Sequence, residues 1–256
     1  TGFIFISIFT YFIRGNLFPV DANIRNWIFL SISGFIGFFI GDLFLFQSYL
    51  EVGSRVSMLI MATSPPITAL LGFLIFGERL SILNILGMVL TILGIAIVIL
   101  SKGDEENKVK VNYSIKGLIY AFLGSLGQAG GMIFSKLGMG SYNPFAATQI
   151  RIIAGFVCYT FLIAYLKKFE NIKKALKDKT ALLYISIGSI FGPFVGVGLS
   201  LLSLQHTSAA ISSTITSITP VTIIPLSVLV FKDKIRIKEV IGALITVIGV
   251  AVLFLF

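Results

Sequence analysis

The chain has 256 residues, of which 56% are hydrophobic and 12% are charged. A soluble domain carries about a quarter charged residues because water must solvate its surface. Half that share, together with 24 Phe, excludes a disordered protein, a disulfide scaffold and an ordinary cytosolic enzyme. The net charge is +9, and the lysines and arginines lie almost wholly between hydrophobic segments, which is typical of residues that set membrane topology. The composition therefore predicts an all-α polytopic protein embedded in a lipid bilayer, with no nucleic-acid partner.

Hydrophobic runs long enough to cross a bilayer recur along the whole chain. Such a helix needs about 20 apolar residues, whereas membrane strands would alternate over stretches of about ten. The polar connections between the runs leave no room for a soluble domain. The sequence predicts nine spans, the first of them partial: 1–13, 27–50, 54–76, 80–101, 114–136, 143–166, 180–205, 208–231 and 236–256.

An internal repeat is the most informative feature of the sequence. A shift of 155 residues aligns 31–101 with 186–256 without a gap, and 18 of these 71 positions are identical. Glycines and prolines keep the same register, for example Gly37 with Gly192 and Pro65 with Pro220. Chance similarity between apolar runs would not preserve both residue types, so the chain contains two copies of one unit.

The register of the repeat predicts the organisation of the chain. The second copy has two helices, 114–136 and 143–166, before the shared region. The same shift places about 40 residues of the first copy before Thr1. We therefore expect two five-helix units: repeat 1 at 1–101 without its first helix, a linker at 102–113, and repeat 2 at 114–256. Because an odd number of spans separates the copies, they should be inverted in the membrane, as in many secondary transporters.

The residues that close each repeat resemble one known family. The segment SRVSMLIMATSPPITALLGFLIFGERLSILNILGMVLTILGIAIVIL at 54–100 has its copy at 208–255. Both resemble the drug/metabolite transporter superfamily, specifically the ten-helix EamA family, in a proline-bearing helix, a Gly-Glu-Arg turn and a glycine-bearing helix. The turn is Gly77-Glu78-Arg79 in the first copy and Lys232-Asp233-Lys234 in the second. The resemblance implies that the first four helices of each half surround a cavity and the fifth is peripheral, where Thr91 and Thr246 would tolerate bulky substitution.

Lysine and arginine are distributed unevenly between the two sides. Fifteen lie on the side that includes 102–113, 167–179 and 232–235, four lie on the other, and Arg151 lies within a span. The positive-inside rule places the fifteen in the cytoplasm, so the C-terminus should be non-cytoplasmic. We expect an integral multi-pass protein of the plasma (inner) membrane of a prokaryote.

Hydroxyl side chains recur on one face of an expected helix. Helix 54–76 carries Ser57, Met61, Ser64 and Thr68 on one side, and the second copy carries Ser212, Thr216 and Thr219. We interpret this face as the lining of a solute pathway; close helix packing, or bonds to the helix's own backbone, is the alternative. Pro65 and Pro220 fall mid-helix, where each removes a backbone donor and forms either a hinge or a static kink.

Polar residues inside other spans are further candidates. Asp42 and Arg151 are the charges well inside spans; Asp42 could bind a proton or cation, and Arg151 a carboxylate, or either could form a structural ion pair. Gln47, Gln128 and Gln149 could line a cavity or bond between helices. We expect the solute between Ser64, Thr68, Thr216 and Thr219, oriented by Asp42 or Gln47.

The sequence carries no H-E-x-x-H, P-loop or G-x-S-x-G motif. One His and one Cys cannot build a metal site, so no cofactor or metal is expected. The leading hypothesis is a non-enzymatic secondary transporter of small organic solutes, exporting amino acids or metabolites by alternating access. An intramembrane enzyme and a non-transporting sensor or structural membrane protein are the alternatives; whether the protein is a monomer or homodimer is left open.

Overall fold

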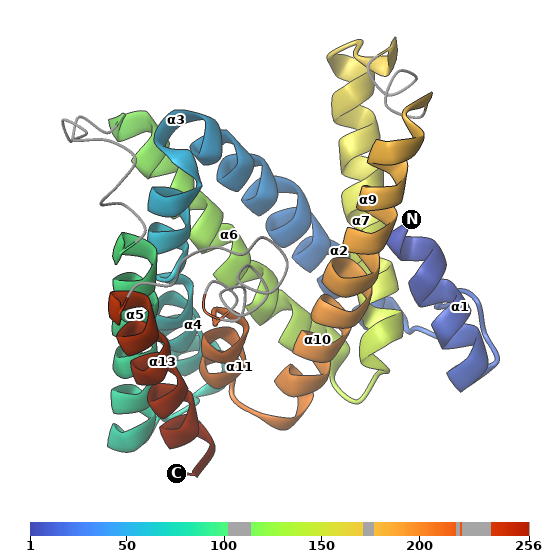
Figure 1. Cartoon of the computed structure of the whole chain (residues 1–256). Coiled ribbons are helices and arrows are strands. Elements are labelled where there is room, and N and C mark those ends of the chain that lie inside the picture. The colour runs from blue at the N-terminus through green and yellow to red at the C-terminus, as the bar shows by residue number, and fades with distance from the viewer. Residues whose placement is uncertain (102–113, 171–176, 219–220, 222–236, 256) are drawn as a thin grey trace. The chain divides into compact units, whose positions relative to one another are not determined.

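A computed structural model describes residues 1–101, 114–170, 177–218, 221 and 237–255 (Figure 1). In these residues the regular secondary structure is helical. The longer helices are α1 (Gly2–Arg14), α2 (Ile24–Gly34), α3 (Asp42–Met61), α4 (Ser64–Phe76), α5 (Ile82–Ser101), α6 (Ile115–Met139), α7 (Pro144–Tyr165), α9 (Lys179–Ser189), α10 (Val197–His206), α11 (Ala209–Thr216) and α13 (Ile237–Leu255). Two π-helical segments, η1 (Phe35–Gly41) and η3 (Ile190–Gly196), join α2 to α3 and α9 to α10.

These helices confirm the expectation of an all-α polytopic membrane protein. Five helical stretches are long and apolar enough to cross a bilayer: Ile24–Gly53, Val56–Phe76, Ile115–Met139, Pro144–Tyr165 and Lys179–His206. Gly2–Arg14, Ile82–Ile97 and Val240–Val252 are shorter apolar helices in the described residues. The expected span 208–231 lies largely outside the described residues.

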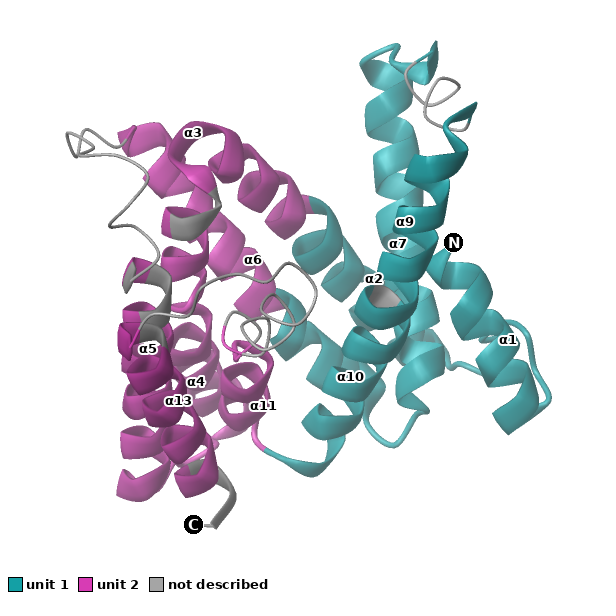
Figure 2. Ribbon diagram, viewed as in Figure 1, with its two compact units in different colours: residues 1–39, 131–207 teal, residues 40–130, 208–256 magenta. Residues whose placement is uncertain are grey.

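The chain forms two compact units, and each takes helices from both sequence repeats (Figure 2). Unit 1 comprises 1–39 and 131–207, and unit 2 comprises 40–130 and 208–256. In unit 1, helices α1, α2 and α10 pack on α7, and Phe9 of α1 meets Phe145 of α7 edge to face at 4.6 Å between ring centroids. In unit 2, α5 packs on α13 and α4 on α11. The repeat boundaries at 1–101 and 114–256 stay a prediction.

The sequence repeat is also a repeat of local structure. Helices α2 and α9 begin 155 residues apart, as do η1 and η3, and α3 and α10. Asn23 and Asp178 occupy equivalent positions and cap α2 and α9 by accepting from the amides of Asn26 and Ala181. A carbonyl or carboxylate oxygen at this position satisfies one of the amides that a helix start leaves without a partner. The same register therefore sets both where the spans begin and where the π-helical segments fall.

The helices of the first repeat are interrupted at two places, and the second interruption corrects an expected span. Gly53 has φ +78° inside α3, so the helix breaks between the expected spans 27–50 and 54–76, and the second copy breaks at the equivalent place, before Ser208. The expected single helix 54–76 is itself interrupted at Ala62 and Thr63. Pro65 consequently lies in the first turn of α4 and not mid-helix. In that turn, its missing N–H has no helical acceptor to lose, which is why proline favours it. Pro220 lies outside the described residues.

A close seam between α5 and α13 involves the same residues of both repeats. A Cβ added to Gly94 would lie 2.6 Å from the carbonyl oxygen of Gly242, and one added to Gly249 would lie 2.6 Å from the amide of Thr91. Thr91 and Thr246 are fully buried, and each donates to the carbonyl of the glycine four residues earlier at 2.8 Å. Bulky side chains at Thr91 or Thr246 do not fit this seam, contrary to the tolerance expected for peripheral helices.

We expect Gly94→Ala to destabilise unit 2, because the added methyl group would overlap the backbone of α13. Overpacking of this kind costs about 1–3 kcal/mol, so the thermal unfolding temperature in detergent should fall. Gly188→Ala in α9 is the control, since a Cβ there meets no described atom within 4 Å. Equal unfolding temperatures for the two variants would contradict the seam.

Candidate functional site

The interruption between α3 and α4 leaves backbone acceptors without helical partners within unit 2. The amide of Thr63 donates to the carbonyl of Ile60 at 2.9 Å, and the Thr63 hydroxyl donates to the same oxygen at 2.7 Å. Residues 65 and 66 are prolines, so the carbonyls of Met61 and Ala62 have no amide four residues later to bond. The break therefore leaves two acceptors that a regular helix would have used.

Ser64 lies directly after this break and is buried, with 3% of its surface exposed. Its hydroxyl oxygen has no hydrogen-bond partner in the described chain. Neighbouring hydroxyls are bonded: Thr68 donates to the carbonyl of Ser64 at 2.9 Å and to the Ser213 hydroxyl at 3.3 Å, and Thr63 bonds to Ser125 at 2.9 Å. Buried polar atoms in native proteins almost always have a partner, so an exception needs an explanation.

The predicted hydroxyl face is divided between separate helices. Ser57 precedes the break and is fully buried; its hydroxyl donates to the carbonyl of Gly53 at 2.9 Å and accepts from Ser48 at 2.7 Å. In the second copy Ser212 is buried, while Thr216 is exposed and donates to the carbonyl of Ser213. Thr219 lies outside the described residues. The structure thus brings Thr68 of α4 into contact with Ser213 of α11, whereas the Ser57 hydroxyl bonds to the carbonyl at the Gly53 break.

The expected orienting groups differ in burial. Asp42 is half-buried and begins α3 immediately after η1, the type of helical distortion that is frequent at functional sites. Gln47 on α3 and Gln128 on α6 are exposed. All three belong to unit 2, as do Ser64 and Thr68. No group of three or more potential metal-binding side chains occurs in the described chain.

Arg151 lies in unit 1 and is packed against η1. Arg151 is buried, with 6% of its surface exposed. Its guanidinium carbon lies 4.3 Å from the centroid of the Phe38 ring, which is a cation–π geometry. A Cβ on Gly34 would come within 2.9 Å of the Arg151 Cα, so the two backbones are in close contact. This arrangement supports a structural role for Arg151 within unit 1.

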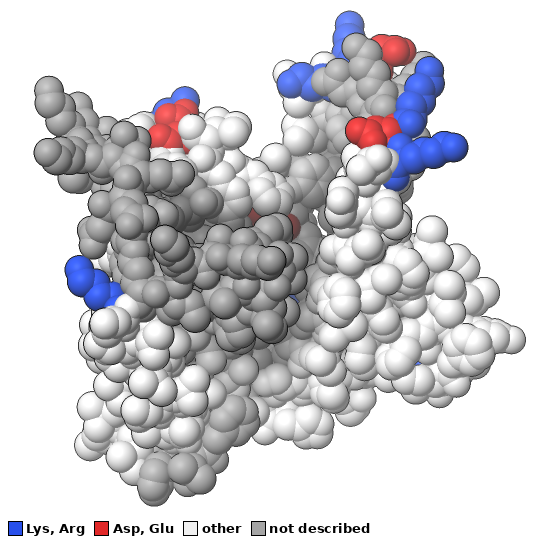
Figure 3. Space-filling model, in the orientation of Figure 1, with Lys and Arg blue, Asp and Glu red and all other residues white. Residues whose placement is uncertain are grey.

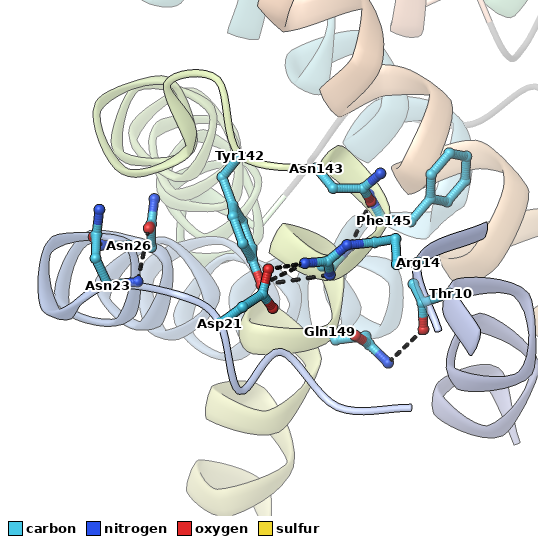
Figure 4. Close-up of polar contacts among 10 residues, drawn as sticks. Thr10, Arg14, Asp21, Asn23, Asn26, Tyr142, Asn143, Phe145 and Gln149 are labelled. Carbon is cyan, nitrogen blue, oxygen red and sulfur yellow. Dashed lines mark hydrogen bonds and ion pairs between the residues drawn. The ribbon is translucent and has the colours of Figure 1, made fainter. Parts of the chain in front are cut away.

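Gln149 bonds between elements of unit 1. Its amide nitrogen donates to the hydroxyl of Thr10 in α1 at 3.2 Å (Figure 4). It also donates to the hydroxyl of Ser7 at 3.0 Å and to the carbonyl of Leu17 at 2.8 Å. Of the two interpretations given for Gln149, the structure therefore shows the hydrogen bonds between helices. The sequence did not predict the partners of Gln149, nor did it predict that Ser125 and Ser213 of unit 2 bond to other hydroxyls. Ser213 corresponds to Met58 in the first repeat, so the repeat did not indicate a polar residue at this place.

A polar cluster joins the α1–α2 connection to Tyr142, which lies between α6 and α7. Arg14 forms an ion pair with Asp21, and Tyr142 donates to Asp21 at 3.1 Å (Figure 4). Burial acts to raise the pKa of Asp21, but hydrogen bonds from Arg14, from the backbone and from Tyr142 outweigh it, so the pKa of this carboxyl is lowered from its ordinary value. The charged form of Asp21 is the form that this cluster stabilises.

Charged side chains gather at the end of unit 1 where α7 stops and α9 begins (Figure 3). Lys167, Lys168, Lys177 and Lys179 are exposed there, together with Glu170 and Asp178. The sides of α7 and α9 instead expose large apolar residues such as Phe156, Phe161 and Tyr184. This separation is typical of spans whose sides contact lipid and whose ends contact water.

The chain matches one known protein family over nearly its whole length. The model of the EamA-like transporter family matches residues 1–100 and 115–255. No curated protein matches the chain. Among solved structures, one described as the crystal structure of a protein matches with a TM-score of 0.74 at 13% sequence identity, covering 99% of this chain and 84% of the other. At that identity the match demonstrates a shared fold.

We expect Asp21→Asn to lower stability slightly at neutral pH, by no more than about 1 kcal/mol because the pair is partly exposed. A carboxyl whose pKa is lowered by folding stabilises the protein above its ordinary pKa, and the stabilisation is lost as pH falls through the folded value. The difference in unfolding temperature between wild type and Asp21→Asn should therefore shrink as pH falls below 3.8. A difference that does not shrink on acidification would show that the ion pair contributes nothing.

Proposed function

The chain belongs to the EamA-like transporter family, a family of membrane transporters of small solutes, and on this premise we propose that it is a secondary transporter that exports amino acids or related metabolites by alternating access. The sequence has no P-loop to bind ATP, so the proposal takes an ion or solute gradient as the driving force. Inverted repeats with interrupted helices are a recurring plan of such transporters. The proposal includes the absence of enzymatic activity.

The unpaired hydroxyl of Ser64 carries the proposal. A buried hydroxyl without a partner costs free energy in the empty protein, and a solute that bonds to it would recover that cost. The carbonyls of Met61 and Ala62, freed by the two prolines that follow, add acceptors at the same break. Hydroxyl oxygens and carbonyls suit a solute that donates hydrogen bonds, such as the ammonium group of an amino acid. We place Ser64 and Thr68 against the solute, with Thr216 beside them and half-buried Asp42 or exposed Gln47 as the orienting group.

We expect the purified protein in proteoliposomes to exchange at least one radiolabelled amino acid from a panel of the twenty protein amino acids. Counterflow, in which unlabelled solute inside the vesicle draws labelled solute in, tests transport without knowledge of the coupling ion. Protein-free vesicles provide the baseline. Binding of panel members without counterflow would support a sensor instead, and turnover of a panel member into a new compound would support an enzyme.

Ser64→Ala separates solute contact from folding. The hydroxyl makes no hydrogen bond within the described chain, so its removal should leave the unfolding temperature unchanged or raise it. If the hydroxyl bonds to the solute, KM in counterflow should rise by about two- to tenfold, the equivalent of one lost hydrogen bond. Thr160→Ala on the exposed side of α7 is the control, because Thr160 bonds only to the carbonyl of Phe156 among the described contacts. An unchanged KM for Ser64→Ala would remove Ser64 from the site.

The proposed orientation places the lysine-rich end of α7 and α9 in the cytoplasm of a prokaryotic cell, and the C-terminus outside. We expect the Arg79→Cys variant to react with a membrane-impermeant maleimide in intact cells, and the Lys168→Cys variant to react only after permeabilisation. Both positions are exposed, and Cys158 would first be replaced by Ser. The reverse labelling pattern would invert the topology.

A further inference from the structure

Glu78 stands on the turn that ends α4, and the turn geometry directs it back toward the helix. Gly77 adopts φ +65° and caps α4, with its amide donating to the carbonyl of Phe73 at 3.0 Å. The amide of Glu78 donates to the carbonyl of Gly72 at 3.3 Å. Such a left-handed turn favours glycine, and it reverses the chain so that the next side chain can lie beside the helix that has just ended.

The Glu78 carboxylate bonds to the first amide of α11, a helix of the other sequence repeat. The amide of Ala209 donates to the two carboxylate oxygens at 3.0 and 3.4 Å. Ala209 is fully buried, so water cannot replace this acceptor. The Ser208 hydroxyl accepts from Ile211 at 3.3 Å and therefore serves a different amide of the same turn. A negative charge at this position is also favourable because the amides of a helix start carry partial positive charge.

Gly72 makes room for this contact. A Cβ at position 72 would lie 2.7 Å from the Glu78 Oε2 atom and 3.9 Å from the Cβ of Ala209. Any other residue at position 72 would therefore displace the carboxylate or separate α4 from α11. Gly72 lies one turn after Thr68, so the face of α4 that receives Glu78 also carries the hydroxyl that donates to Ser213 of α11.

We propose that Glu78 is a positioning residue for transport. Its carboxylate holds the start of α11 against α4, and this contact positions Ser213 of α11 beside Thr68 of α4. Thr68 in turn positions the helical turn that bears Ser64. Thr68 donates both to Ser213 and to the carbonyl of Ser64, so displacement of α11 would reach the solute site through one side chain. This inference rests on the proposed function for its effect on transport, but the contact with α11 can be tested without any transport.

Hydrogen–deuterium exchange of the full chain in detergent tests the contact. Glu78→Gln keeps the length of the side chain and removes its charge, and Glu78→Ala removes the acceptor. Both should accelerate exchange of the amides of 209–211, by about tenfold for Glu78→Ala, because a buried amide loses its partner. Glu78→Asp keeps the charge and should restore part of the protection. Glu51→Gln is the control, since Glu51 of the same unit pairs with Lys116 at 3.7 Å. Unchanged exchange in both Glu78→Gln and Glu78→Ala would overturn the inference.

A double-mutant cycle shows whether Gly72 acts through Glu78. Gly72→Ala should by itself accelerate exchange at 209–211, because its methyl group displaces the carboxylate. In a Glu78→Ala background the same change should have almost no further effect on these amides. Additive effects of the two substitutions would mean that Gly72 affects α11 independently, which overturns the role assigned to the carboxylate.

Transport kinetics separate positioning from folding. With the amino acid that wild type exchanges fastest, Glu78→Gln should raise KM several-fold, whereas a role in folding alone would reduce the amount of active protein and leave KM unchanged. Accelerated exchange with an unchanged KM would therefore overturn the role in transport. If wild type moves no panel member, the role in transport falls with the proposed function, and the exchange data still decide whether Glu78 holds α11.

Discussion

The hydrogen bonds of the backbone constrain this protein more than any side-chain contact. Within a bilayer no water is available for a free N–H or C=O group, so each span must be helical and each interruption must find partners inside the protein. The described interruptions satisfy this rule only in part, because the break at Ala62 and Thr63 leaves the carbonyls of Met61 and Ala62 without a helical partner. The hydroxyl of Ser57 closes the Gly53 break by bonding to its carbonyl, and Thr63 uses its own hydroxyl on the carbonyl of Ile60. Glu78 supplies the acceptor for the first amide of α11.

The two repeats share the skeleton of these interruptions but not the contacts made there. The helix starts and the π-helical segments coincide at a spacing of 155 residues. In the first copy Gly37 allows Gly131 of α6 to approach, since a Cβ added to Gly131 would lie 2.9 Å from the Gly37 Cα, whereas a Cβ on the equivalent Gly192 meets no described atom within 4 Å. Equivalent small residues can therefore line a packing seam in one copy and meet no described neighbour in the other. Identity between copies predicts local backbone geometry better than it predicts partners.

The sequence predicts the spans, the repeat and its register because apolar length and glycine positions determine them directly. It does not predict the break at Ala62 and Thr63. Helical spacing alone placed Ser57, Ser64 and Thr68 on one continuous face, and Pro65 was interpreted as a mid-helix kink. A proline pair is equally compatible with the first turn of a new helix, and the choice depends on where the preceding helix ends, which apolar length does not mark. Gln149 shows the same limit, since its partners Ser7 and Leu17 are distant in sequence.

The distribution of charge within the spans bears on how a solute could bind and leave. Arg151 stacks on Phe38 and its backbone packs closely on Gly34, which favours a structural role for this charge in unit 1. The hydroxyls and carbonyls of the proposed site in unit 2 are neutral and cost less to bury than a charge, and Asp42, proposed beside them, is only half-buried. Neutral acceptors also bind a donor group less tightly than a carboxylate would, because hydrogen bonds between uncharged groups are the weaker kind. A transporter must release what it binds, and a site made mainly of Ser64 and freed carbonyls, with the charge of Glu78 kept at the start of α11, is consistent with that requirement.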